Sequence, residues 1–364
     1  MFWPSEDLAE LRGSDVVRKI GREEADDMIR SRIVPVIRAH QDVFFGPEED
    51  GRISDDQLVE LAHRMGSAIM AYAFDLEKDE DEEEEAEDEW VEDREGRTML
   101  GMVPMADMLN ADAEFNAHIN HGEDALTAVA LRPIRKGEEI FNYYGPLSNG
   151  ELLRRYGYVT RRHARYDVVE LPWALVEKQL RARFAANLTP AEWEKAEKYL
   201  RESYEEEGEE PEESYVIEYE SKGPDATGQF QDTETFTGLP EELGERVKTY
   251  LKALKKGNSS LGDALADKAV RKEVYLQAVG QALKEREAQY PTALEADEGL
   301  ITSGTPTGRQ EMALMVRVGE KRLLRRAQEW AALELEGLRR ETSGRSREER
   351  NGDDGAPAAK RRRA

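Results

Sequence analysis

The chain begins with two segments in which apolar residues recur every three or four positions. One runs from Ser14 to about His40, and the other runs from Asp56 to Phe74. This spacing places the apolar side chains on one face of a helix. Both segments are therefore predicted to be amphipathic helices that pack against other elements.

The pattern changes after the second helix. Residues 125–131 and 139–144 are short stretches rich in apolar and aromatic residues, which favours β-strands. Pro133 and Gly137 lie between the two stretches and predict a turn that joins them. A further helix is expected from Ser148 to Tyr158.

From Ala174 onward, helical spacing returns and dominates the rest of the chain. The predicted helices are 190–204, 240–256, 262–288 and 310–338. The stretch 214–238 interrupts them and is expected to hold a strand or a loop. The sequence therefore predicts an α+β fold, with a mixed first part, a mainly helical second part and a boundary near residues 170–190.

Composition narrows the class of protein. The chain has 364 residues, a length that suits two domains, and it has no cysteine. That absence excludes a disulfide framework, a thiolate zinc site and a cysteine nucleophile. We find no run of about 18 apolar residues and no basic-then-apolar start, so we expect a soluble intracellular protein without a membrane segment.

The formal net charge of −26 is concentrated in two segments. Residues 75–93 carry a net charge of −13, and residues 201–220 carry one of −9. Such blocks favour solvated loops, although their field also attracts a basic partner. The tail from Arg339 is basic and ends in Lys-Arg-Arg-Arg at 360–363, which indicates a nuclear-import sequence or simply a soluble end.

The common catalytic and metal-binding patterns are absent. Of the five histidines only His118 and His121 are close together, and a polar loop explains them better than a metal site. The sequence contains no GxGxxG, GxxxxGK[ST] or GxSxG pattern. Residues 141–145 and 156–158 instead place three tyrosines beside glycines, which is typical of buried structural rings or of a ligand site.

Two long segments carry a family resemblance. Residues 102–117 (MVPMADMLNADAEFNA) and 134–159 (IRKGEEIFNYYGPLSNGELLRRYGYV) resemble the core motifs of SET-domain protein lysine methyltransferases. The similarity is to the Rubisco large-subunit methyltransferase class, and within it to fungal ribosomal lysine methyltransferases. Residues 290–295 and 317–321 resemble the helical substrate-binding domain of that class.

The resemblance implies a domain order. Residues 1–170 would form a partial SET domain with a helical insertion and an acidic loop at 75–95. Residues 171–338 would form the helical substrate-binding domain, and residues 339–364 would form a basic disordered tail. The glycine-rich GxG start of the SET domain has no counterpart before Tyr72. We therefore expect an N-terminally incomplete SET fold that exposes apolar surface.

The resemblance also implies a cofactor site for S-adenosylmethionine. Asn110 and Ala111 match the family's asparagine–histidine pair, whose main chain holds the cofactor; alanine here replaces the histidine. Tyr72 matches a cofactor-contacting position, and Tyr156 matches the tyrosine that closes the cofactor and lysine channels. No metal is implied.

The family's catalytic tyrosine corresponds to Tyr144. Tyr158 stands beside Tyr156 in the lysine channel, where many relatives have phenylalanine, and this favours monomethylation. The expected function is methylation of a lysine on a basic ribosomal or nuclear protein. The expected protein is a monomer in the nucleus, with the cytoplasm as an alternative location, and it has no direct nucleic-acid or membrane partner. The alternatives are a non-catalytic module that binds a basic protein and, from charge alone, an acidic histone chaperone.

Overall fold

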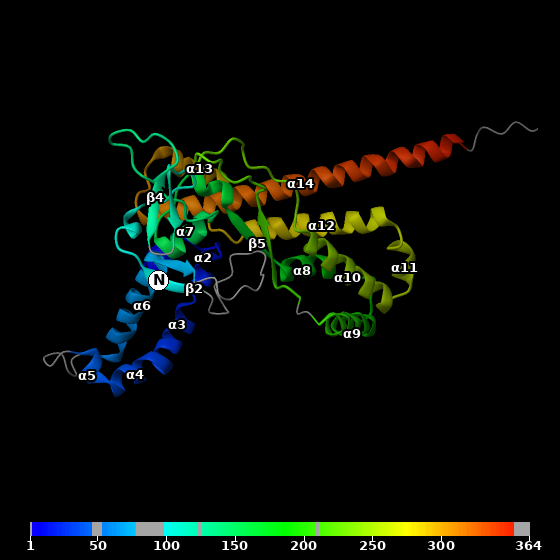
Figure 1. Ribbon diagram of the computed structural model, residues 1–364. Coiled ribbons are helices and arrows are strands. Elements are labelled where there is room, and N and C mark those ends of the chain that lie inside the picture. The colour runs from blue at the N-terminus through cyan, green and yellow to red at the C-terminus, as the bar shows by residue number, and fades with distance from the viewer. Residues whose placement is uncertain (1, 46–52, 78–97, 123–124, 209–210, 353–364) are drawn as a thin grey trace, which may run out of the picture. The chain divides into compact units, whose positions relative to one another are not determined.

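The computed structural model describes residues 2–45, 53–77, 98–122, 125–208 and 211–352 (Figure 1). The chain divides into two compact units. The first comprises Met1–Asp167, Tyr219–Thr235 and Glu295–Gly319. The second comprises Val168–Glu218, Phe236–Leu294 and Glu320–Ala364. Because compactness does not define family membership, the domain bounds expected at 1–170 and 171–338 remain predictions.

The first unit opens with a series of short helices. They are α1 (Ser5–Ala9), α2 (Val16–Lys19), α3 (Arg22–Met28), the π-helix η1 (Ile29–Ile33), α4 (Val34–Ala39) and α5 (Gln41–Phe44). The apolar pattern predicted helix from Ser14 to His40, and the backbone interrupts it. Gly21 adopts a φ of 58° before α3. Pro35 lacks the N–H that an unbroken helix needs, and the turn before it widens into η1.

The second predicted helix is confirmed as α6 (Asp55–Tyr72), which begins with a capping box between Ser54 and Gln57. Its buried residues Leu58 and Val59 form a hydrophobic cluster with Ile29 and Val34. The first helices and α6 therefore pack together through this cluster, whereas Leu61, Met65, Ile69 and Met70 on the predicted apolar face of α6 are exposed. Figure 1 shows the two sets of helices near one another.

Helix α6 leads directly into β1 (Ala73–Glu77), which pairs antiparallel with β2 (Thr98–Met102). Glu77 lies opposite Thr98, so the intervening acidic sequence leaves and rejoins the fold at one end of this hairpin. Residues 78–97, which hold most of the first acidic segment, lie outside the described residues.

A second hairpin contains one predicted strand and one that was not expected. The stretch 125–131 is confirmed as a strand by β4 (Leu126–Ala130), whose partner is β3 (Ala117–His121). The histidines assigned to a polar loop, His118 and His121, lie in β3 and are exposed. They belong to the sheet because alternate residues Ala117 and Ile119 are buried.

The strand predicted at 139–144 is wrong. Asn142 forms an isolated parallel bridge with Ala111, and no ladder extends from it. The neighbouring residue Phe141 is instead held by Asn116, whose side-chain oxygen accepts its amide at 2.9 Å. Tertiary contacts thus replace strand pairing in this β-rich stretch. The turn before it is present, with Gly137 at a φ of 88°.

The helix predicted from Ser148 is confirmed as α7 (Asn149–Tyr156). The Ser148 hydroxyl caps it by accepting the amide of Glu151 at 3.2 Å, and Gly157 ends it in the left-handed conformation. The 3₁₀ helix η3 (Arg162–Tyr166) follows, and both α7 and η3 belong to the first unit.

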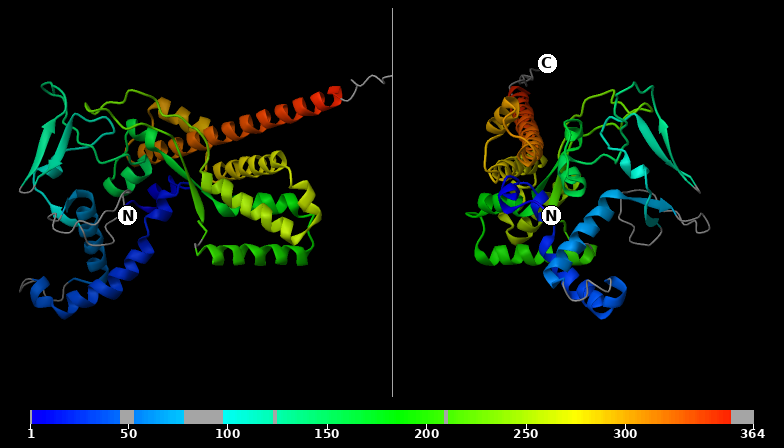
Figure 2. Two further views of the ribbon diagram at one scale, coloured as in Figure 1. Left: turned by 45° about the vertical axis from the view of Figure 1, so that its right-hand side comes forward. Right: turned by 90° about the vertical axis from the view of Figure 1, so that its left-hand side faces the viewer.

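The second unit is mainly helical, as the sequence predicts. Its elements are the antiparallel pair β5 (Val168–Pro172) and β6 (Ser214–Glu218) with α8 (Trp173–Phe184), α9 (Pro190–Glu207), α10 (Glu241–Gly257), α11 (Ser260–Ala264) and α12 (Lys268–Glu287). Helix α9 packs against α10, and α8 packs against α12 (Figure 2). The single helix predicted at 262–288 is two helices, because Asp267 caps the start of α12.

The last helices are α13 (Leu294–Ser303) and α14 (Arg309–Gly352). Residues 339–352, expected to be part of a disordered tail, are instead helical, and residues 353–364 lie outside the described part of the chain. Within the described residues, no helix is long and apolar enough to cross a membrane. The described ranges also contain no group of three or more metal-ligating side chains.

Candidate functional site

Three of the tyrosines that the sequence singles out lie together in the first unit. The ring centroids of Tyr144 and Tyr156 are 4.8 Å apart, and those of Tyr156 and Tyr158 are 6.4 Å apart. Tyr156 ends α7, and Gly157 turns the chain so that Tyr158 follows on the same side. All three rings are half-buried and form one aromatic cluster.

The Tyr144 phenol has a defined orientation. Its hydroxyl donates to the carbonyl oxygen of Leu109 at 2.9 Å. Burial raises the pKa of this phenol, and the neighbouring Tyr156, Tyr72 and Asp107 raise it further. The group therefore stays protonated at neutral pH. The phenol donates its only proton to Leu109, so toward a bound group it can act only through the lone pairs of its oxygen.

A short main-chain segment, Asn110–Asp112, lies against the same cluster. The Asn142 amide donates to the Asn110 carbonyl at 2.8 Å, and the Asp112 amide donates to the Asn142 carbonyl at 3.2 Å. In a parallel bridge of this kind, Asn142 bonds the residues on either side of Ala111, so the N–H and C=O of Ala111 itself point away from Asn142. There the Tyr158 hydroxyl donates to the Ala111 carbonyl at 3.2 Å.

The remaining predicted cofactor residues lie at the edge of this arrangement. The side chain of Tyr72 is 52% exposed, and Tyr72 is one of the groups that act on the pKa of Tyr144. The Asn110 side chain is exposed and donates to Glu139 at 2.6 Å. The structure thus brings Tyr156 and Tyr158 close to Tyr144 and Ala111, whereas Tyr72 and the Asn110 side chain lie exposed at the edge.

Tyr143 and Tyr144 are adjacent in sequence and have different surroundings. Tyr143 stacks on Phe115 with centroids 4.7 Å apart, and its hydroxyl donates to the Tyr166 hydroxyl at 3.3 Å. Phe115 is itself fixed by Gly228, whose carbonyl accepts the Phe115 amide at 3.0 Å. The FNYYG motif therefore supplies one structural tyrosine and one tyrosine for the site.

Apolar side chains are exposed on the segments that lead into the site. They are Met65, Ile69 and Met70 on α6, Leu100 and Met102 on β2, and Met105 and Met108 before Leu109. Met105 also has a φ of 78°, which a non-glycine residue rarely adopts. These residues give this part of the first unit an apolar surface.

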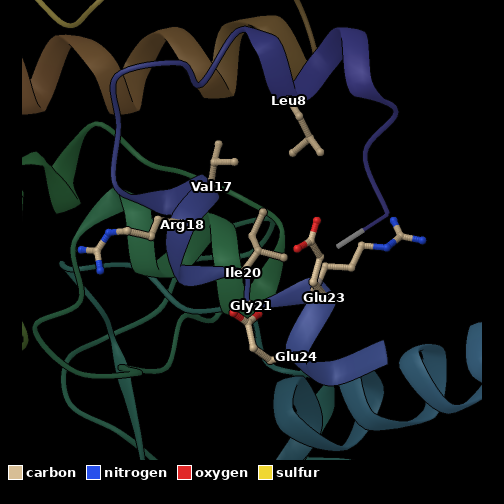
Figure 3. Close-up of a pocket in the computed structure, with 8 residues that line it drawn as sticks. Leu8, Val17, Arg18, Ile20, Gly21, Glu23 and Glu24 are labelled. Carbon is tan, nitrogen blue, oxygen red and sulfur yellow. The ribbon is translucent and has the colours of Figure 1, made fainter. Parts of the chain in front are cut away.

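A pocket of 250 Å³ lies elsewhere in the first unit (Figure 3). Its apolar lining comes from Leu8, Val17 and Ile20, and its carboxylates come from Glu23 and Glu24. It shares no residue with the tyrosine cluster, and sequence reasoning assigned no functional role to its residues. Its charges of both signs indicate no particular ligand.

Comparison with known families assigns two modules to the chain. The SET domain family matches residues 13–145, and the Rubisco LSMT substrate-binding family matches residues 241–324. The first match contains the Asn110–Asp112 segment and Tyr144, and the second covers helices of the mainly helical part. Residues 13–145 are thus similar to SET domains, and residues 241–324 are similar to Rubisco LSMT substrate-binding domains.

The chain is similar to individual proteins of this kind. It is 36% identical over 191 residues to ribosomal lysine N-methyltransferase 4 of Saccharomyces cerevisiae, covering 51% of this chain and 37% of that protein. It is 33% identical over 162 residues to human N-lysine methyltransferase SETD6, covering 44% of this chain and 30% of the relative. The matched part thus spans only about a third of these relatives.

The fold is also found among solved structures. The SET-domain structure of LSMT bound to lysine and AdoHcy matches 93% of this chain and 68% of its own, with a TM-score of 0.55 and 18% identity. A structure of Rubisco LSMT bound to AdoMet matches equally well, with a TM-score of 0.55 and 19% identity. The α+β fold expected from the sequence, a SET domain with a helical substrate-binding domain, is confirmed.

Proposed function

We propose that this chain is an S-adenosylmethionine-dependent protein-lysine N-methyltransferase. The observation that carries the proposal is the Tyr144 phenol, which faces Tyr156 and is held by the Leu109 carbonyl beside the main chain of Ala111. The family matches and the named methyltransferase relatives support the same reading.

The residues present fit the proposed cofactor. Ala111 directs its main-chain groups toward the tyrosines, and Tyr156 supplies an aromatic face next to Tyr144. Because the contact uses main chain, alanine serves where the family usually has histidine. S-adenosylmethionine, when bound, would supply a methyl group on a positively charged sulfur. Ala111, Asn110, Tyr156 and Tyr72 are the residues proposed to hold it.

The reaction requires a lysine amine without its extra proton. A free lysine has a pKa near 10.4, so it must lose a proton to water before its nitrogen can attack. Half-buried rings of Tyr156 and Tyr158 provide an environment that disfavours the charged ammonium. A neutral amine held beside these rings would present its lone pair to the methyl group that the bound cofactor would supply.

Tyr144 is proposed to align this step. Its lone pairs are available because its proton is donated to Leu109, so the phenol oxygen accepts a hydrogen bond from the amine or attracts the methyl hydrogens. The raised pKa of Tyr144 argues against its acting as a base, because the phenolate would be scarce at pH 7. Orientation is therefore its contribution.

The direct test is calorimetry of this chain with S-adenosylmethionine, followed by mass spectrometry of a basic protein incubated with both. We expect binding, and a mass gain of one methyl group on a lysine. A matched control is Tyr143→Phe, which changes a phenol outside the site and should bind equally well. Absence of binding by the wild-type chain would contradict the proposal and favour a non-catalytic module that binds a basic protein.

A ribosomal or nuclear basic protein is the proposed substrate class. The acidic sequence between Tyr72 and Asn110 supports it, because that sequence joins the hairpin that adjoins both motifs, and its field attracts basic groups. The name of the yeast relative supports a ribosomal target, and the Lys-Arg-Arg-Arg run at 360–363 supports a nuclear location.

Monomethylation is a further part of the proposal. The Tyr158 hydroxyl donates to Ala111 and leaves its lone pairs able to bind a water molecule in the space of a second methyl group. The substitution Tyr158→Phe removes this oxygen, so we expect dimethyllysine to appear beside monomethyllysine in the product. Mass spectrometry of the modified peptide measures the ratio, and an unchanged ratio would contradict this role.

A further inference from the structure

A polar network lies next to the main chain of Ala111, with two buried members, one half-buried member and one exposed member. It consists of Asp112, Thr160, Arg162 and His163, here called the polar latch. The Thr160 hydroxyl lies 3.1 Å from Asp112 Oδ1 and 2.9 Å from His163 Nδ1. Arg162 donates to Asp112 Oδ2 at 3.1 Å. The latch joins the Asn110–Asp112 segment to the turn that follows Tyr158.

The proton positions in the latch follow from counting donors and acceptors. Thr160 has one hydroxyl proton, and the Asp112 carboxylate can only accept, so Thr160 donates to Asp112. The Thr160 oxygen accepts the backbone amide of His163 at 3.2 Å and therefore also accepts from His163 Nδ1. The imidazole therefore carries a proton on Nδ1, and burial, which lowers the pKa of His163 to about 4, keeps the ring neutral at pH 7. Every hydrogen-bonding capacity of Thr160 is used.

Burial makes this arrangement costly to alter. His163 is fully buried, and Asp112 is 9% exposed. The Asp112 carboxylate also accepts the Ala113 amide at 2.7 Å, so a single side chain fixes both its own main chain and the turn across from it. A buried charge that loses one of its donors is destabilised, so the network holds as a unit.

The latch and the site share one piece of backbone. Ala111 precedes Asp112, and its carbonyl accepts the hydroxyl of Tyr158, which lies two residues before Thr160. Two hydrogen bonds therefore join the Ala111–Asp112 segment to the Tyr158–Thr160 segment. One runs from the Tyr158 hydroxyl to the Ala111 carbonyl, and the other runs from the Thr160 hydroxyl to the Asp112 carboxylate. The second hydrogen bond involves no ligand, and it acts on the residue that follows Ala111, in addition to the bridge with Asn142.

We propose that the polar latch positions the main chain of Ala111 for cofactor binding, with the Thr160 hydroxyl as its central group. The inference rests on the proposed function only for the identity of the cofactor. Thr160, Asp112 and His163 are positioning residues in this proposal, because they act through Ala111 and touch neither cofactor nor substrate.

The test compares Thr160→Val with Thr160→Ser. Valine keeps the shape and removes the hydroxyl, whereas serine keeps the hydroxyl, and both keep the Thr160 backbone amide that donates to Asn149 Oδ1 at 2.9 Å. We expect valine to raise the Kd and KM for S-adenosylmethionine by about tenfold or more, with the KM for the protein substrate unchanged, and serine to restore both. Equal cofactor affinity in the valine variant and the wild type would overturn the proposal.

Amide hydrogen exchange without cofactor provides a readout that does not depend on activity. The reporter amides are those of Asp112, Ala113 and Asn142, and the β3–β4 hairpin is the internal control. We expect faster exchange at the reporters in Thr160→Val, with no change in the hairpin. Unchanged reporters would overturn the latch itself, whereas a wild-type chain that fails to bind S-adenosylmethionine would refute the proposed function instead.

Discussion

Replacing Tyr144 with phenylalanine is expected to lower methyl transfer by at least about a hundredfold while the protein stays folded. The ring remains, so its packing against Tyr156 at 4.8 Å is preserved. What disappears is the phenol oxygen that orients the amine. The lost hydrogen bond to Leu109 should cost only about 1 kcal/mol of folding free energy. Turnover measured by mass spectrometry reports the loss of methyl transfer, and thermal unfolding reports the loss of folding stability.

The neighbouring tyrosine supplies the matched control. Tyr143→Phe also removes one phenol oxygen and one hydrogen bond, in this case to Tyr166 at 3.3 Å. Because Tyr143 stacks on Phe115 outside the cluster, this variant should turn over nearly as fast as the wild type. Turnover at the wild-type rate by Tyr144→Phe would remove Tyr144 from the mechanism, whatever the control shows.

The second large effect concerns the pH dependence of stability. Burial lowers the pKa of His163 from 6.5 to about 4, and the Asp112 carboxylate at 3.6 Å offsets this only in part. Between these two values the unfolded chain binds a proton that the folded chain does not. The contribution of the neutral His163 to folding stability is therefore fully present above pH 6.5 and is lost as the pH falls toward 4. From pH 7 to pH 5 the loss is about 2 kcal/mol.

Carboxylates elsewhere also titrate in this range, so the measurement must isolate His163. Urea unfolding of the wild type and of His163→Gln at several pH values gives the difference in slope, which should be steeper for the wild type. The groups around the imidazole are Asp112, Thr160 and the ring of Tyr166, whose centroid is 6.2 Å away. An imidazole that titrates near 6.5 in NMR spectra of the folded wild type would contradict the expectation.

Helices were predicted better than strands. Helices α6, α7, α9 and α10 follow the apolar periodicity closely, because a helix is specified by residues near in sequence. Strands β1, β2 and β3 were not predicted, and the strand expected at 139–144 does not form. Strand formation depends on a partner distant in sequence, and Asn116 binds the Phe141 backbone where a ladder was expected.

The candidate site was only partly predictable. The resemblance of two motifs assigned Tyr144, Tyr156 and Ala111, and the structure brings these residues together. Residue type alone did not distinguish the adjacent Tyr143 and Tyr144, and only the match to the family motif selected Tyr144. His163 was noted as one of five histidines without a role, and its place in the polar latch depends on Asp112, which is about fifty positions away.

The amino-acid sequence by itself determined the helical character of most of the chain, the concentration of negative charge in two segments and the two motifs that carry the family resemblance. These are properties of residue type and local spacing. Only the tertiary structure decided that Ala111 presents its main chain to Tyr158 and that Tyr144 donates to Leu109. It also decided that the half-buried Thr160 joins the buried His163 to Asp112, the residue that follows Ala111. The physical reason is that hydrogen-bond partners and burial arise from chain segments that are distant in sequence and meet only in the folded protein.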